Sequence, residues 1–171
     1  MKLSIALVLA LAAASPAHAQ FLQRPAIGFA DAKAMAAACE DLAARSGWKT
    51  TFAVLDEGGR LLYFSRMDGA DFNHGDMAIN KAMTALVDGR PSSVTSDRIK
   101  AGETNVLSYP NYVAAGGGYP IFVTQHKVGA IGISGTVNFA QAEACATAAL
   151  AAVKLPLPSS KPPPPPAPPA R

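Results

Sequence analysis

The side chains best suited to chemistry lie between residues 66 and 81. His74 and Met77 are three residues apart at the predicted start of a helix, close in sequence to Asp68. Imidazole and thioether groups both serve as axial ligands of haem iron in proteins. We therefore predict His74 as a metal ligand and Met77 as a weaker candidate for the same role. The alternative is that Met77 packs in the core while His74 is a solvated residue near the helix start.

Arg66 and Lys81 flank this segment and could bind an anion. The Arg66 guanidinium can hold a carboxylate or a haem propionate through two parallel hydrogen bonds, and Lys81 supplies a point charge. Asp68 belongs to the same charged turn, and we include it among the candidate cofactor-binding residues. The alternative is that both cations form surface ion pairs with nearby aspartates, which contribute little to stability.

A glycine run at residues 116–118 is flanked by tyrosines. Its central residue, Gly117, could form a backbone nest for an anion or let a flat ligand lie against the chain. The run lacks the strand and helix context of a dinucleotide-binding motif, so a turn before a strand is an equal alternative. Tyr112, like Tyr109 and Tyr119, could stack on or ligate a cofactor, or could be a half-buried packing residue.

These residues need a strand end and a helix start to hold them in place. Residues 51–55 and 60–64 are rich in β-branched, aromatic and aliphatic side chains, which predicts two strands. Residues 56–59 read Asp-Glu-Gly-Gly and predict a hairpin turn, because Gly accepts a positive φ. Asn73 then caps a helix whose apolar positions recur at helical spacing as far as Leu86.

The rest of the chain supplies two helices and a second hairpin. Residues 29–45 and 139–153 predict Ala-rich helices, the second of them capped by Asn138. Residues 121–124 and 128–134 predict strands, and two glycines in the latter indicate close approach of another segment. Because both strand pairs are hairpins, the sequence predicts an α+β fold with helices packed on an antiparallel sheet.

The two ends of the chain lie outside this predicted domain. Residues 1–19 combine a basic start, an apolar stretch and a small-x-small motif, which predicts a signal peptide cleaved after Ala19. The apolar stretch is too short for a membrane span, so we expect a secreted or periplasmic protein without membrane insertion. Residues 20–28 are predicted as a lead-in and residues 29–154 as the domain. Residues 155–171 predict a Pro-rich tail, either a solvated spacer or a ligand for an aromatic groove.

Composition limits the class of protein. The chain has 171 residues, of which 50% are hydrophobic and 16% are charged, so a sizeable core can form. The formal net charge of +3 is spread along the chain without a basic block, which argues against nucleic-acid binding. Cys39 and Cys145 lie in the two predicted Ala-rich helices. They either form a disulfide in an oxidising compartment or remain small buried residues, and both interpretations stay open.

Four sequence segments together resemble one known family. They are VLDEGGRLLYFSRMDGA (54–70), INKAMTAL (79–86), GGGYPIFV (116–123) and VGAIGISG (128–135). In this order they are similar to the GlcG/HbpS family, which includes the C-terminal domain of PduO. The resemblance implies a profilin-like or PAS-like α+β fold, with an antiparallel sheet of about five strands flanked by helices. It also implies haem binding, homo-oligomers, and roles in haem sensing, protection or iron-dependent haem degradation.

The motif positions of that family extend across the whole predicted domain. They are occupied here by Arg66, Met67, Asp68, Gly69, Lys81, Thr84, Gly117, Pro120, Gly132, Ser134 and Gly135. After the last motif the family has an Asp-containing stretch, whereas residues 136–141 of this chain contain no acid, which weakens an enzymatic interpretation.

The sequence therefore predicts a secreted or periplasmic haem-binding protein, with His74 as the iron ligand and Arg66 or Lys81 for the propionates. One alternative is an enzyme acting on a small hydroxy- or oxo-acid without haem, with Arg66 and Lys81 holding the carboxylate. Another is a module that docks a membrane sensor through its Pro-rich tail and helix faces.

Overall fold

Four antiparallel strands in the order β2-β1-β4-β3 form the sheet that carries every other element. The strands are β1 (Thr51–Asp56), β2 (Leu61–Arg66), β3 (Gly118–Val123) and β4 (His126–Ser134). The helices are α1 (Phe29–Arg45), α2 (His74–Asp88), α3 (Ser92–Lys100), the 3₁₀ helix η1 (Thr104–Ser108) and α4 (Phe139–Ala152). The computed structural model describes residues 23–136 and 138–158, so the predicted signal peptide and most of the predicted tail lie outside the described residues.

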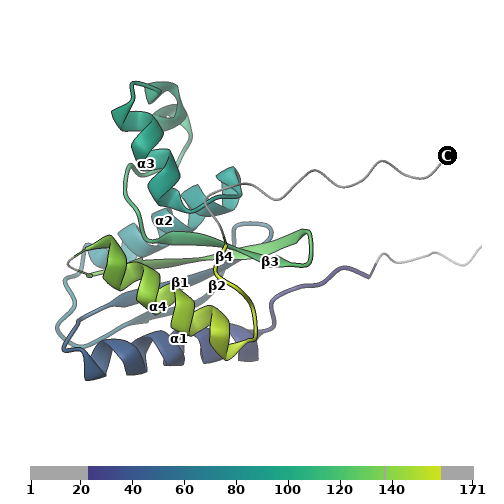
Figure 1. Cartoon of the computed structure of the whole chain (residues 1–171), viewed down its shortest axis with the longest axis vertical. Coiled ribbons are helices and arrows are strands. Elements are labelled where there is room, and N and C mark those ends of the chain that lie inside the picture. The colour runs from purple at the N-terminus through teal and green to yellow at the C-terminus, as the bar shows by residue number, and fades with distance from the viewer. Residues whose placement is uncertain (1–22, 137, 159–171) are drawn as a thin grey trace, which may run out of the picture.

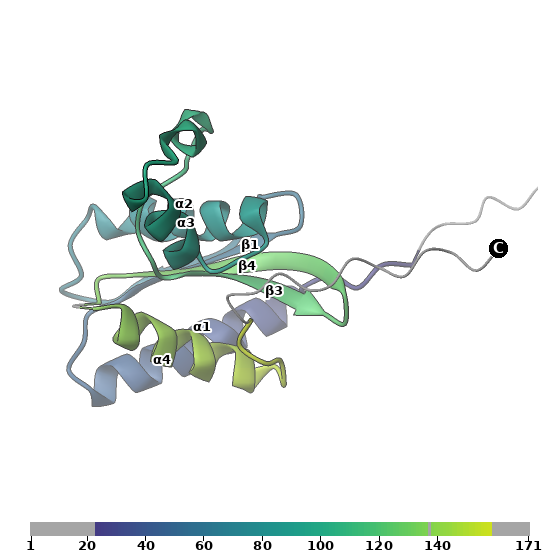
Figure 2. The ribbon, with the colours of Figure 1, turned by 45° about the horizontal axis from the view of Figure 1, so that its top comes forward.

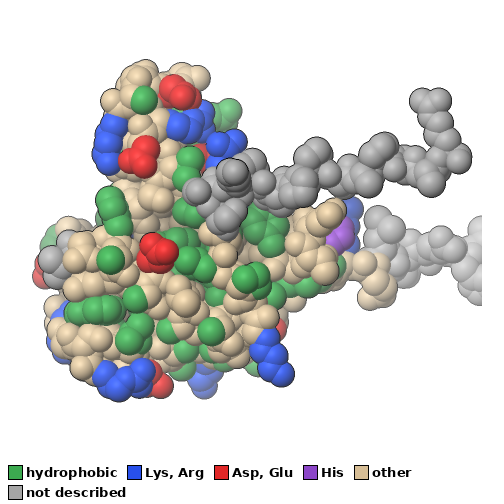
Figure 3. Space-filling model, in the orientation of Figure 1, with side chains coloured by type: hydrophobic (Ala, Val, Ile, Leu, Met, Phe, Trp, Pro, Cys, Tyr) green, Lys and Arg blue, Asp and Glu red, His purple; other side chains and the backbone are tan. Residues whose placement is uncertain are grey.

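Helices cover both faces of the sheet. Figure 2 shows α1 and α4 side by side on one face and α2 on the other. The segment containing α3 and η1 extends beyond α2 and forms a projection in Figure 1. Charged side chains of both signs gather on this projection in Figure 3. Among the described residues, no helix has both the length and the apolar character needed to cross a membrane.

The face toward α1 and α4 holds the larger apolar side chains. Successive residues of a strand point to opposite faces, so every second residue of β1 and β4 contributes to this side. The main hydrophobic cluster includes Met35, Phe52, Val54, Ile131 and Ile133. A disulfide between Cys39 and Cys145 joins α1 to α4. Of the two interpretations that the sequence left open for these cysteines, a disulfide or two free buried thiols, the disulfide is therefore the correct one.

The face toward α2 is lined by small residues, and the helix backbone therefore lies directly on the sheet. A Cβ atom built on Gly132 would lie 1.9 Å from the carbonyl oxygen of Ala78, so a side chain at this position would force α2 away. The second glycine of β4, Gly129, lies close to the neighbouring strand β1. A Cβ atom there would lie 2.2 Å from the carbonyl oxygen of Leu55. The close approach predicted at the two glycines of β4 is confirmed.

Local sequence patterns placed most elements correctly. The helix predicted over residues 29–45 has those bounds, and β2 ends two residues later than predicted. The side chain of Asn138 accepts a hydrogen bond from the backbone amide of Gln141 at 3.0 Å, which confirms the predicted cap of α4. Gly89 ends α2 with a φ of 64°, a left-handed conformation that glycine adopts without strain.

The sheet has four strands, fewer than the five that the family resemblance implied. Residues 101–117, which separate α3 from β3, form turns and η1 in place of a strand. Pro110 has no backbone N–H to give to a sheet, and Asn111 has a φ of 65°, so this segment cannot continue a ladder. α3 is longer than the short turn predicted around residues 96–99. It begins at Ser92, directly after Pro91.

The prediction for Asn73 is confirmed in position but not in hydrogen bonding. Asn73 stands at the start of α2, but its side chain makes no capping hydrogen bond. The chain enters the helix through a turn, in which the amides of His74 and Gly75 bond to the carbonyls of Asp71 and Phe72. The Gly75 amide, one of the two that a capping side chain at Asn73 would accept from, is therefore already satisfied.

The start of the predicted Pro-rich tail joins the core. Leu155 and Leu157 pack against the main hydrophobic cluster, whereas a solvated spacer was predicted from residue 155. Lys154, with a φ of 60°, turns the chain back after α4. The amide of Leu155 then donates to the carbonyl of Leu150 at 2.9 Å. Sequence reasoning took the leucines as part of the proline run because two prolines lie among them.

Candidate functional site

Three polar side chains meet where the first half of α2 crosses the end of β4. The Nδ1 atom of His74 lies 3.0 Å from the Oγ atom of Ser134. The Nζ atom of Lys81 donates to the same Oγ atom at 3.4 Å and to the carbonyl oxygen of Ile133 at 3.2 Å. His74, Ser134 and Lys81 therefore form a continuous polar chain, which runs from the half-buried imidazole to the buried amine.

The spacing along each element explains this meeting. His74 and Lys81 are seven residues apart, which is close to two helical turns and puts both side chains on one face of α2. Ser134 is the last residue of β4 and follows Gly132 by two, so its side chain points to the same face as that glycine. The absence of a side chain at Gly132 brings α2 close enough for these contacts.

Lys81 is a buried amine without an acidic partner. Its side chain is only 9% exposed, and none of the ion pairs among the described residues includes it. Burial lowers the pKa of Lys81, because the charged form loses hydration that no carboxylate replaces. An unpaired amine in this position is suited to hold an anionic group or to act as a neutral base.

Gly117 forms one wall of the Lys81 site. Its φ of 114° excludes other residues, and a Cβ atom there would lie 3.3 Å from Nζ of Lys81 and 2.6 Å from the Ile133 carbonyl oxygen. The carbonyl of Gly117 accepts from the Ile133 amide at 2.8 Å, and the Gly118 amide donates to Ser92 at 2.9 Å. The Gly118 amide is therefore engaged with Ser92, and the anion nest at Gly117 stays a prediction.

Three exposed phenylalanines lie on segments next to this site, two of them near the start of α2 and one against the glycine run. Phe72, two residues before His74, is 86% exposed. The exposed ring of Phe64 lies against Gly75, and the exposed ring of Phe139 lies against Gly116. We call Phe64, Phe72 and Phe139 the aromatic rim. Sequence reasoning missed the rim, although the phenylalanine between two polar residues in Asp71-Phe72-Asn73 was a usable signal for one member.

The other predicted site residues lie at different distances from the polar chain of His74, Ser134 and Lys81. Half-buried Met77 lies on α2 between His74 and Lys81, on the same face. Exposed Arg66 is at the end of β2, separated from Ser134 by Thr51, with which both residues pair across β1. Asp68 is exposed in the turn after β2. Among the described residues, no hydrogen bond or ion pair joins it to His74, Ser134 or Lys81.

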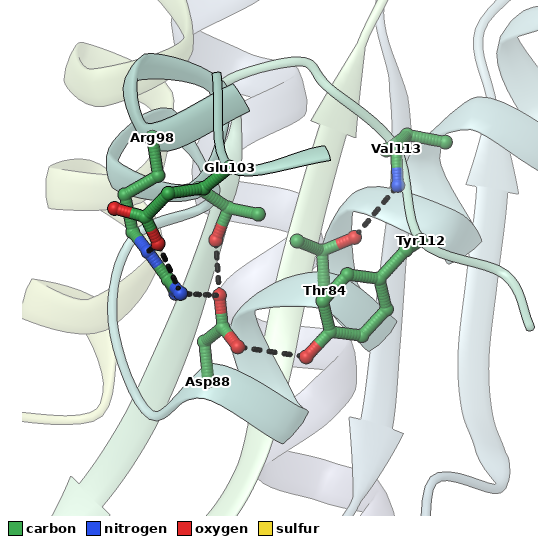
Figure 4. A network of polar contacts seen from close by, with 7 residues as sticks. Thr84, Asp88, Arg98, Glu103, Tyr112 and Val113 are labelled. Atoms are coloured by element: carbon green, nitrogen blue, oxygen red, sulfur yellow. Dashed lines mark hydrogen bonds and ion pairs between the residues drawn. The ribbon is translucent and has the colours of Figure 1, made fainter. Parts of the chain in front are cut away.

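Tyr112 takes part in a different polar network, shown in Figure 4. Its hydroxyl donates to Asp88 at 2.7 Å, and Thr95 donates to the other oxygen of the same carboxylate. Arg98 lies 3.9 Å from Asp88 and bonds to Glu103 at 2.8 Å. Burial and the Asp88 carboxylate both raise the pKa of Tyr112. This network ties the projection to the end of α2, so the hydroxyl predicted to serve a cofactor has a structural partner.

A cavity of about 280 Å³ lies on the opposite face of the sheet from the polar chain. It is lined by the start of α1, the β3–β4 hairpin and the end of α4, through residues such as Met35, Ile121 and Leu155. This position differs from that of the pocket predicted near the Arg66 turn and α2. Among the described residues, no group of three or more His, Cys, Asp or Glu side chains is placed to hold a metal ion.

The fold and the site together define a small α+β domain that holds a lysine–serine–histidine chain beneath one helix. The sequence model of the family described as "Haem degrading protein HbpS-like" matches residues 27–151. The chain belongs to this family.

Similar proteins support the same assignment. Protein GlcG of Escherichia coli is 32% identical over 103 residues, which cover 60% of this chain and 77% of GlcG. A double mutant of HbpS from Streptomyces reticuli superposes with a TM-score of 0.72 at 29% identity, covering 81% of this chain and 97% of HbpS. PduOC in its complex with haem superposes with a TM-score of 0.71 at 25% identity, covering 78% of this chain and 99% of PduOC. The α+β class expected from the sequence is confirmed.

Proposed function

We propose that this protein binds haem at the start of α2, with Nε2 of His74 as the iron ligand. One observation carries the proposal: Ser134 holds the imidazole through Nδ1, and Nε2 has no hydrogen-bond partner among the described residues. An imidazole held by one nitrogen presents the other in a fixed direction, which is the usual arrangement of a histidine ligand.

The residues around His74 fit the chemical groups of haem. The aromatic rim offers exposed apolar surface for a porphyrin face, and Met77 lies one turn along the same helix face. Arg66 is exposed at the end of β2 and is free of ion pairs among the described residues, so it is our first choice for a propionate. Lys81 contributes positive charge deeper in the site. Bound haem supplies redox-active iron, which this chain's own side chains lack.

Comparison with known proteins supports the proposal in two ways. The family description names haem degradation, and PduOC, whose crystal structure is of a haem complex, shares the fold. Of the three roles that bound haem could serve, the family description favours degradation over sensing and protection. Haem degradation is tested by adding oxygen and a reductant and measuring release of iron together with loss of the Soret band.

We also propose that the protein is secreted or periplasmic and that it forms homo-oligomers. The Cys39–Cys145 disulfide supports an oxidising compartment, where such bonds persist. The exposed aromatic rim offers apolar surface for a second copy as well as for haem. Cell fractionation tests the location, and light scattering after gel filtration, with and without hemin, tests assembly.

The proposed function is tested by hemin titration of the mature protein, followed at the Soret band. His74→Ala is the test variant, and His126→Ala is the matched control, because His126 is exposed at the opposite end of β4 from Ser134. We expect saturable binding by the wild type and by His126→Ala, and a lost or shifted Soret band for His74→Ala. Equal spectra for all three proteins would remove His74 as the ligand, and absence of saturable binding would remove haem.

The unpaired amine of Lys81 favours a second candidate, the binding of a small carboxylate without haem. A carboxylate would supply the ion-pair partner that Lys81 lacks among the described residues. Thermal stabilisation by small hydroxy- and oxo-acids, lost in Lys81→Met and kept in His74→Ala, is the result that would favour this candidate over haem.

A further inference from the structure

The two outer edges of the sheet, on β3 and on β2, are built differently. The Ile133 amide donates to Gly117, so alternation along the ladder turns the backbone groups of Gly118 and Pro120 away from β4. Both positions are closed to a further strand, because the Gly118 amide donates to Ser92 at 2.9 Å and Pro120 has no N–H. Strand β2 contains no proline, and no described segment pairs with its outer edge. Only the β2 edge is therefore open to a partner strand.

The free backbone groups of β2 are those of Phe64 and Arg66. The Met67 amide donates to the Thr50 carbonyl at 3.0 Å, and residues of an antiparallel strand face the partner strand alternately. Phe64 and Arg66 therefore point their N–H and C=O groups away from β1. The register with β1 shifts opposite Leu55, which leaves residues 63–66 as the regular part of this edge.

Exposed apolar side chains gather along the same edge. Leu61 and Phe64 are exposed on β2 itself, and Phe72 is exposed in the loop that follows the strand. The exposed ring of Phe29, at the start of α1, lies 5.9 Å from the ring of Tyr63. Apolar surface concentrated in one place on a domain is typical of an interface with another protein.

The charges at the two ends of β2 identify a second copy of this chain as the partner. Arg60 and Asp68 are both exposed, and neither belongs to an ion pair among the described residues. Each lies four residues from Phe64, on opposite sides of it. Antiparallel pairing of two copies about Phe64 therefore places Arg60 of each copy opposite Asp68 of the partner subunit. Pairing about Arg66 would oppose two arginines, and pairing about Ser65 would leave both charges unmatched.

We propose that two copies of this protein join through their β2 edges, antiparallel and centred on Phe64, to form one continuous sheet. This inference deepens the proposed homo-oligomer by naming its interface, and it does not depend on haem. The two-fold axis of such a pair is perpendicular to the sheet, so both Phe64 rings lie on the face that carries α2. Because Phe64 lies against Gly75, the two proposed His74 sites adjoin across this axis.

Sedimentation velocity of the haem-free mature protein tests the interface. Arg60→Asp and Asp68→Arg each place like charges opposite one another, so each should raise the dimer Kd by at least about tenfold. The double variant Arg60→Asp and Asp68→Arg exchanges the two charges and should restore the wild-type Kd. Asp97→Arg, at an exposed aspartate on α3, is the matched control and should leave the Kd unchanged. A wild-type assembly larger than a dimer should fall to smaller species in both single variants.

A single introduced cysteine tests the register. In a pair centred on Phe64 the two Cα atoms of this residue lie about 5.5 Å apart, which is within the range of a disulfide. Phe64→Cys should therefore form a covalent dimer on mild oxidation, seen on a gel without reductant. Gln125→Cys, at the exposed hairpin between β3 and β4, is the control and should stay uncrosslinked.

The outcomes separate this interface from haem binding. A monomeric wild type, or an assembly that both single charge variants keep, would overturn pairing through β2. Failure of the double variant to restore assembly would overturn the register centred on Phe64. A monomer that binds hemin through His74 would keep the haem proposal without the interface. A charge-sensitive dimer without saturable hemin binding would support the interface and remove haem.

Discussion

The two faces of the sheet are built from different residues and serve different ends. Toward α1 and α4 the sheet presents bulky apolar side chains, and a disulfide joins the two helices. Toward α2 it presents mainly Ala, Gly, Thr and Ser beside Leu55, and the buried groups at this face include Lys81 of α2. The first face buries much apolar surface, and the second brings polar groups together.

The contrast shows how one small domain can hold a reactive cluster. Large side chains keep a helix at a distance from a sheet, whereas Gly132 lets the α2 backbone touch β4. That closeness allows Lys81 and His74 to reach Ser134. The face with α2 therefore buries less apolar surface and gains less stability from it. Apolar burial and the disulfide on the other face offset this loss of stability. If this division holds, variants of the two faces should affect stability and hemin binding separately.

The largest effect is expected from removing the disulfide. The double variant Cys39→Ala and Cys145→Ala opens a link between residues that are 106 positions apart. Loss of a cross-link over a loop of this length costs about 4 to 5 kcal/mol in the chain-entropy description. Urea denaturation measures the loss, while hemin affinity under native conditions should stay unchanged. A large drop in affinity with the fold intact would break the proposed division between the faces.

Gly132→Ala should come next, and it should affect both properties. The added Cβ meets the Ala78 carbonyl at 1.9 Å, so α2 must shift, at a cost of about 3 kcal/mol. The shift also lengthens the contacts of Ser134 with His74 and Lys81, so hemin affinity should fall. Gly47→Ala is the control, because a Cβ there meets nothing within 4 Å and only the φ of 72° is unfavourable. Equal losses in the two variants would contradict the close-approach explanation.

Lys81→Met should raise stability and remove a pH dependence. Below the folded-state pKa the wild type keeps a buried charge, so the variant should be more stable there by about 2 kcal/mol. Burial makes the folded pKa of Lys81 lower than the unfolded one, so the unfolded state binds more protons between the two values. Wild-type stability should therefore rise with pH in that window and approach the variant's. The measurement is urea denaturation at a series of pH values, and a constant difference between the proteins would contradict the burial effect.

Tyr112→Phe should have the smallest effect, because it lies outside both faces. The change removes one hydrogen bond to Asp88, which keeps Thr95 and Arg98 as partners, at a cost of about 1 kcal/mol. Faster hydrogen exchange in α3 with unchanged hemin binding is the expected outcome. Tyr109→Phe, at an exposed tyrosine that stacks on Tyr112, should change neither property. Weaker hemin binding by Tyr112→Phe would restore this residue as a ligand contact.

Sequence reasoning succeeded where a local pattern carries the cause. The bounds of α1, the first hairpin and the Asn138 cap each depend on residues near in sequence. Gly129 and Gly132 indicated close approach by lacking a side chain, although the segments that approach them are distant in sequence. Sequence reasoning placed Asn73 at the helix start but not its hydrogen bond, because a preceding turn already satisfies the Gly75 amide, one of the two that a cap would serve. It also missed the aromatic rim, whose members lie on three separate segments.

The sequence by itself determined the α+β class, the family and the candidates His74, Lys81 and Gly117, because periodicity, turn residues and motifs are written along the chain. Only the tertiary structure decided that Ser134, 60 residues from His74, joins the imidazole to the lysine, and that Tyr112 serves Asp88. Hydrogen bonds between distant segments depend on how closely two elements pack. That distance is set by the sum of many side-chain volumes across the sheet, which no single segment of the sequence records.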